Sequence, residues 1–152
     1  MLRALTALLL AGFVAACSKH GAGSGGGGHA HTAPHGGTLV ELGQHAYALE
    51  LVRDAATGKL SAFILDGHAE NFIRLKAPSF TLVATVGGEK RPLTFQPVAN
   101  PATGETVGDT SQYDAQADWL KTTAAFEGTI HALEIRGSKF EHIAIRFPGG
   151  GH

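Results

Sequence analysis

The chain has 152 residues, 43% of them hydrophobic, and its formal net charge is −1 at pH 7. This balance gives the chain no net basic field of the kind that attracts nucleic acid or anionic lipid headgroups. Beyond a glycine-rich N-terminal tract, roughly 115 residues remain, which is enough for one domain with a core and too few for two.

Residues 1–16 have the layout of a secretory signal, with one positive charge at Arg3, an apolar run, and small residues at the end. The run is too short to span a bilayer as a mature helix. The closing V-A-A-C motif, which ends at Cys17, resembles the lipobox of bacterial lipoproteins, and this resemblance implies that Cys17 is acylated. The alternative is an ordinary signal peptide with a chance cysteine. Cys17 is the only cysteine, so no internal disulfide can form.

The residues after Cys17 predict which membrane the protein is anchored in and how its folded domain is tethered. Ser18 stands where lipoproteins of the inner membrane often carry Asp, so the resemblance implies an outer-membrane lipoprotein facing the periplasm of a Gram-negative host. Acyl chains contribute about 0.8 kcal/mol of membrane affinity for each buried CH₂. The following tract to Gly37 is rich in glycine and histidine, which predicts a flexible tether with an end-to-end distance of about 25 Å.

After the tether, the sequence predicts strands separated by turn residues. Tyr47, Leu49 and Leu51 alternate with other residues and so place apolar side chains on one face of a strand. The pair Gly87-Gly88 predicts a hairpin turn. The expected strands are 45–51, 59–65, 72–75, 79–86, 91–98, 124–135 and 139–147.

One segment, 111–121, is compatible with a helix of two or three turns that begins at Ser111 and closes one end of the core with Trp119 and Leu120. Short strands with turns between them predict a single antiparallel β-sandwich of seven to nine strands, for which an immunoglobulin-like topology is one possibility. A small barrel is the alternative. The expected organisation is a signal peptide (1–16), an acylated cysteine and tether (17–37), a sandwich domain (38–148) and a mobile tail (149–152).

The tether carries the main candidate metal ligands. His29, His31 and His35 are spaced H-x-H-x-x-x-H between glycines, with His20 as a further candidate. Neutral imidazole is a common ligand of zinc and copper(II). Because Pro34 excludes a regular helix, the ligands would come from flexible backbone, and ordering it would cost about 1–2 kcal/mol for each residue. The alternative is that histidine serves here only as a soluble spacer residue.

His131 and His142 form a second candidate pair on the last hairpin. With a turn at Gly137-Ser138, Leu133 would lie opposite His142 and His131 opposite Ala144, which places the two histidines diagonally on one face. That face would be exposed, so two unrelated surface histidines are the favoured interpretation. The opposite, core-facing set would be Ile130, Ala132, Ile143, Ile145 and Phe147.

Three histidines stand alone in the sequence. His68 lies between Asp66 and Glu70 in a turn, which could complete a metal site but is more simply a polar hairpin tip. His45 begins a strand close to the end of the tether, so a site at the junction of tether and domain is conceivable. His152 ends the chain after three glycines.

Two resemblances bear on function. Pro34-His35-Gly36-Gly37 followed by an alternating strand resembles the metal-associated β domain of periplasmic adaptors in heavy-metal RND efflux systems, although the chain lacks their coiled-coil hairpin and lipoyl-like module. The region 34–147 also resembles small bacterial lipoproteins that carry an L-D-G-H-A-E-N loop, here 65–71. The first resemblance implies metal handling in the periplasm, with His35 as the matching position and an envelope or efflux protein as partner.

Three classes of function remain. The first is a lipid-anchored periplasmic binding protein for zinc or copper(II); a copper(I) carrier would need more sulfur ligands than one methionine and one cysteine. The second is a structural lipoprotein that docks an envelope partner through its sandwich and binds no metal. An enzyme is not expected, because the sequence contains none of the nucleophile, zinc-protease or phosphate-loop motifs, although a metallohydrolase built from scattered histidines would leave no spacing signature.

Overall fold

The computed structural model describes residues 31–149. The predicted signal peptide, Cys17, His20, His29 and His152 lie outside this range. The elements are β1 (Thr38–Leu42), β2 (Tyr47–Asp54), β3 (Lys59–Asp66), β4 (Phe80–Val86), β5 (Glu89–Pro97), β6 (Gln112–Gln116), α1 (Trp119–Thr122), β7 (Phe126–Ile135) and β8 (Ser138–Phe147). None of the described residues forms a helix of the length and apolar character that a membrane crossing requires.

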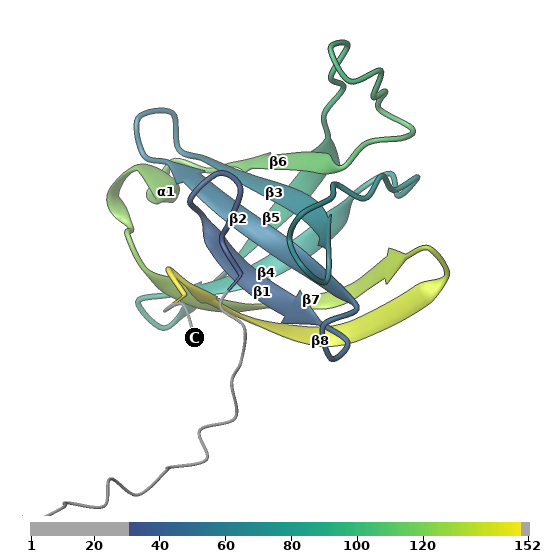
Figure 1. The fold of residues 1–152 in the computed structure, drawn as a ribbon. Helices are drawn as coiled ribbons and strands as arrows, with labels where there is room; N and C mark the ends of the chain where they lie inside the picture. The colour runs from purple at the N-terminus through teal and green to yellow at the C-terminus, as the bar shows by residue number, and fades with distance from the viewer. Residues whose placement is uncertain (1–30, 150–152) are drawn as a thin grey trace, which may run out of the picture.

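The eight strands form one antiparallel sheet in the order β1-β2-β3-β6-β5-β4-β7-β8. The sheet folds over between β6 and β5, where only Gln96 and Pro97 of β5 pair with β6, so that its two halves face each other (Figure 1). The strands β1 and β8 are the two ends of the sheet, and no ladder joins them within residues 31–149. The prediction of a single all-β antiparallel sandwich is therefore confirmed.

Aromatic side chains fill the space between the two halves. Phe80 stacks on Phe95 at a ring-centroid distance of 4.8 Å, and the buried ring of Tyr113 lies 5.2 Å from Phe80. Tyr47 on β2 meets Phe140 on β8 edge to face at 5.9 Å, which brings the first and last parts of the sheet together. Among the described residues, the buried side chains of this core come from Leu42 to Phe147.

The predictions of secondary structure for residues 111–121 and 72–75 are wrong. The segment 111–121 is not a helix: Gln112–Gln116 is strand β6, which pairs with β3 and β5, and only one helical turn follows as α1. Alternate residues Tyr113 and Ala115 are buried, so sheet pairing overrides the helix propensity of the segment. The expected strand 72–75 is reduced to two isolated bridges, one at each end.

The last hairpin differs in register from the prediction. The two turn residues are Arg136 and Gly137, and both have positive φ (50° and 83°). Two-residue hairpin turns with this geometry are favoured because their twist agrees with the right-handed twist of the flanking strands. The strands pair Ile135 with Ser138 and Ile130 with Ile143, so His131 lies directly opposite His142 and not diagonal to it. Ala132, predicted in the core, is exposed, because the alternation of buried residues shifts by one between Ile130 and Leu133.

Candidate metal centre

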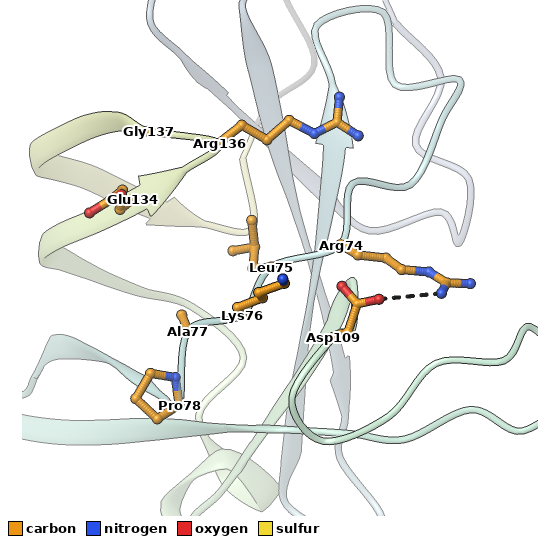
Figure 2. Close-up of a pocket in the computed structure, with 9 residues that line it drawn as sticks. All are labelled: Arg74, Leu75, Lys76, Ala77, Pro78, Asp109, Glu134, Arg136 and Gly137. Carbon is orange, nitrogen blue, oxygen red and sulfur yellow. Dashed lines mark ion pairs between the residues drawn. The ribbon is translucent and has the colours of Figure 1, made fainter.

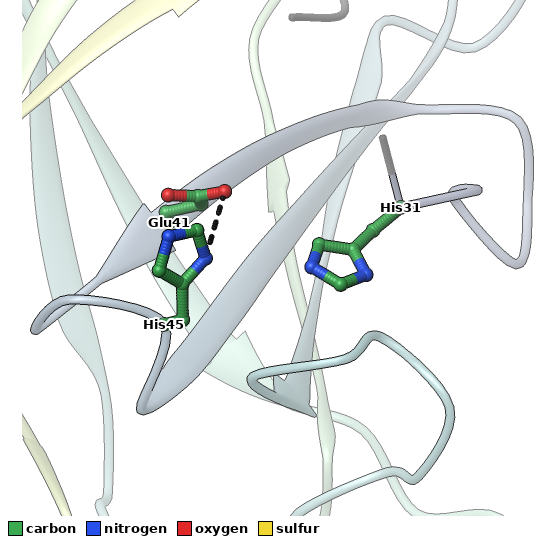
Figure 3. A group of neighbouring side chains, drawn as sticks. All are labelled: His31, Glu41 and His45. Atoms are coloured by element: carbon green, nitrogen blue, oxygen red, sulfur yellow. Dashed lines mark ion pairs between the residues drawn. The ribbon is translucent and has the colours of Figure 1, made fainter. Parts of the chain in front are cut away.

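Three side chains near the start of the described chain form the one group among these residues with the geometry of a three-ligand metal site. One ligand atom each from His31, Glu41 and His45 lies within 4.8 Å of the other two (Figure 3). His45 Nδ1 and Glu41 Oε1 are 3.2 Å apart. Two ligands of a tetrahedral zinc ion bound at about 2.0–2.1 Å lie about 3.3 Å apart. The Glu41–His45 pair already has this spacing, and a small movement of His31 would complete the set.

A fourth candidate ligand lies beside this group. The ring centroid of His68 is 5.6 Å from that of His31, and the His31 ring is 6.2 Å from that of His45. Three histidines and one carboxylate therefore converge from the N-terminal segment, the β1–β2 turn and the 66–71 loop. We call His31, Glu41, His45 and His68 the N-terminal histidine cluster.

The β1–β2 turn places His45 over β1. Gly43, Gln44 and His45 all have positive φ (60°, 52° and 66°), a run that reverses the chain tightly. This reversal brings the His45 ring back to Glu41, which is exposed on β1. The prediction that His45 begins a strand is wrong, since the strand begins at Tyr47.

The 66–71 loop is held in a fixed shape beside this turn. Asp66 accepts hydrogen bonds from the Glu70 backbone N–H (3.0 Å) and the Asn71 side-chain amide (2.6 Å). The hydrogen bond from Asn71, joined by backbone N–H groups and opposed by desolvation, lowers the pKa of Asp66. Gly67 packs directly on the backbone of His45. His68 is thus carried on an ordered polar turn, as its sequence predicts, but one that lies against the histidine cluster.

His35 does not join the cluster. Its ring Nδ1 lies 2.9 Å from Oε2 of Glu50, and its face stacks on Phe63 at 3.9 Å. The exposed Phe72 lies 5.6 Å from the same ring. His35 borders a cavity of about 280 Å³ that is also lined by Phe63, Phe72 and Glu105. The sequence grouped His35 with His31 as metal ligands, and the structure instead separates them into neighbouring environments.

The second predicted pair is brought together on the β7–β8 hairpin. The rings of His131 and His142 lie edge to face with centroids 6.2 Å apart, and both residues are exposed. His142 has a φ of 52°. Two imidazoles alone leave half of a tetrahedral shell to water, so this pair offers fewer ligands than the N-terminal histidine cluster.

A cavity with both basic and acidic side chains at its border lies apart from the histidines. It has a volume of about 560 Å³ and is bordered by Arg74, Lys76 and Arg136 (Figure 2). Arg74 is paired there with Asp109, and its Nη1 lies 3.6 Å from the Oδ2 of that carboxylate. No histidine lines this cavity, so it lacks the imidazole ligands that zinc and copper(II) favour.

Two acidic residues at the site were missed by sequence reasoning. Glu41 lies four residues before His45, and this spacing is a usable signal only once a tight turn between them is known. Glu50 alternates with Leu49 and Leu51, a pattern that places it on the solvent face. It is nevertheless fully buried, because the 35–37 segment covers that face of β2.

Comparison with known proteins gives no assignment, since no family model, curated protein or solved structure matches this chain. The function is therefore inferred from the chain's own side chains.

Proposed function

We propose that this chain is a lipid-anchored periplasmic binding protein for a transition metal, zinc or copper(II), and that it is not an enzyme. One observation carries the proposal: His31, Glu41 and His45 present ligand atoms within 4.8 Å of one another, with the His68 ring next to His31. Imidazole and carboxylate ligands suit zinc and copper(II).

The exposure of these side chains fits a protein that takes up and releases its metal. The side chains of His45 and Glu41 are 56% and 53% exposed, so an ion can reach them without a conformational change. An exposed site of this kind gives moderate affinity, as expected for transfer to an envelope or efflux partner. The predicted acylation of Cys17 would keep the site close to the membrane, because His31 lies only 14 residues after the anchor.

Calorimetric titration of zinc and copper(II) into residues 18–152, purified without a histidine tag, tests this proposal. This chain keeps every residue of the sandwich. We expect micromolar binding of one ion, and at least a tenfold loss in the double variant H31A/H45A. The matched control H131A/H142A removes two exposed histidines elsewhere and should bind as wild type does. Equal binding by H31A/H45A and wild type would exclude this site.

A second function, docking of an envelope partner without metal, is favoured by a different surface. Phe72 is 45% exposed and lies beside Phe63 and His35 at the edge of the 280 Å³ cavity. Exposed aromatic side chains of this kind are enriched at protein interfaces. On this alternative, F72S would abolish co-purification of a partner with the membrane-bound protein, while H31A/H45A would leave it unchanged.

A further inference from the structure

We propose that Glu50 is the positioning residue of the metal site, which it controls by fixing the N-terminal segment so that His31 faces His45 and His68. This inference rests on the proposed function. Glu50 is not itself a ligand, since its carboxylate is fully buried beneath that segment.

Both oxygens of the Glu50 carboxylate are used by one short stretch of chain. Oε1 accepts hydrogen bonds from the backbone N–H groups of His35 (2.8 Å) and Gly37 (2.9 Å). Oε2 lies 2.9 Å from His35 Nδ1, within hydrogen-bond distance. A buried carboxylate without these donors would be costly, so the segment and Glu50 depend on each other.

Within residues 31–149, every hydrogen bond that ties 31–37 to the sandwich ends on Glu50. The remaining bond of the segment is internal and closes a turn from Gly36 N–H to the Ala33 carbonyl (3.0 Å). Gly37 also lies against β2 so closely that a Cβ there would approach the Leu51 carbonyl oxygen to 2.5 Å. These contacts leave His31 only four residues from a fixed point.

Release of the segment would cost the site its third ligand. Ordering a free backbone residue costs about 1–2 kcal/mol, so a His31 on an untethered chain would bring little net affinity to the ion. When Glu50 fixes the segment, its backbone is already ordered in the metal-free folded protein, so zinc binding does not have to order it. Glu41, His45 and His68 come from other elements and would keep their positions.

The test is a double-mutant cycle with zinc calorimetry on residues 18–152: wild type, H31A, E50L and H31A/E50L. We expect E50L to weaken zinc binding about tenfold, the usual scale for residues that orient ligands. H31A should weaken it similarly in wild type and have no further effect in E50L. E50Q, which keeps one carbonyl oxygen for the two backbone donors, should recover much of the affinity.

The matched control is E105L. Glu105 is also almost buried and accepts hydrogen bonds from Ser111 (2.7 Å from the hydroxyl) and Thr103, but it holds a different loop. The zinc affinity of the E105L variant should stay within twofold of that of wild type. If E50L does not fold, G37A and H35A loosen the same segment with Glu50 retained, and both should weaken zinc binding.

A metal-free measurement separates this inference from the proposed function. Proton nuclear Overhauser contacts between the His31 and His68 rings should be present in wild type and lost in E50L. Wild-type zinc affinity and retained ring contacts in E50L would overturn the role of Glu50 and leave the metal site standing. If wild type binds no metal, the proposed function fails, and the ring contacts still decide whether Glu50 positions His31.

Discussion

The backbone of Gly67 lies directly on the carbonyl group of His45, with no space between them for a side chain. This contact joins the 66–71 loop to the β1–β2 turn. It sets the distance between the two elements that carry His68 and His45. The geometry of the histidine cluster therefore depends on a glycine that offers no ligand itself.

Replacing Gly67 by alanine should push the 66–71 loop away from His45. A Cβ would overlap the His45 carbonyl, and such overpacking costs about 1–3 kcal/mol. We expect G67A to lower the free energy of urea unfolding by this amount and to weaken zinc binding about tenfold. A Cβ at Gly108 would meet no other atom within 4 Å, so G108A should change neither quantity measurably. Wild-type zinc affinity in G67A would show that the contact does not shape the site.

The carboxylate of Glu105 should contribute to stability in acid. Desolvation by burial raises its pKa, but hydrogen bonds from Ser111 and Thr103 and the charge of Arg74 outweigh this and lower it below 4.5. The unfolded chain therefore binds the proton more readily, and stability is lost as pH falls through the folded pKa. We expect E105Q to lose less of its free energy of urea unfolding than wild type does as the pH falls below about 5. The exposed change E127Q should keep the wild-type curve; an unaltered slope in E105Q would contradict the assignment.

Tyr113 should show the opposite dependence in base. Its ring is buried and its hydroxyl donates to the Ala77 carbonyl at 2.9 Å. Desolvation by burial, with a smaller contribution from Asp109, raises its pKa from 10.0 to about 12. The contribution of the protonated Tyr113 hydroxyl to the free energy of unfolding is fully present below pH 10 and is lost as the pH rises from 10 to about 12. Y113F should cost about 1 kcal/mol at pH 7 and flatten the alkaline decline, as measured by denaturant unfolding at each pH.

His142 adopts a backbone conformation that glycine favours. Its φ is 52°, which costs a non-glycine residue about 1 kcal/mol or more. We therefore expect H142G to be neutral or stabilising by up to about 1 kcal/mol in urea unfolding. His131 lies opposite at an ordinary strand conformation, so H131G should destabilise the protein by about 0.5–1 kcal/mol. An equal loss from both substitutions would exclude strain at His142.

The strands of this protein were predictable where alternation and turn chemistry agree. Tyr47, Leu49 and Leu51 alternate within β2, and Gly87-Gly88 makes the β4–β5 turn as expected. Residues 112–116 failed the same reasoning, since five residues without β-branched side chains give no local strand signal. Their strand forms because β3 and β5 offer pairing on either side.

The histidine cluster could be predicted only in part. His31 and His45 are recognisable as candidates by residue type, and His45 lies close in sequence to the end of the tether, although the histidine nearest to it there, His35, contacts Glu50 instead. Their convergence with His68 depends on a turn with three successive positive φ angles and on the close approach of Gly67. No sequence pattern predicts the three successive positive φ angles, and none identifies His45 as the residue that Gly67 contacts. The burial of Glu50 depends on a contact between segments 13 to 15 residues apart, which alternation alone predicts wrongly.

The most direct test of the metal site is a crystal structure of residues 18–152 grown with zinc, with anomalous diffraction recorded at the zinc edge. We expect one strong anomalous peak between His31, Glu41 and His45, with His68 or water as the fourth ligand. Absence of a peak there, or a peak only between His131 and His142, would exclude the proposed metal site.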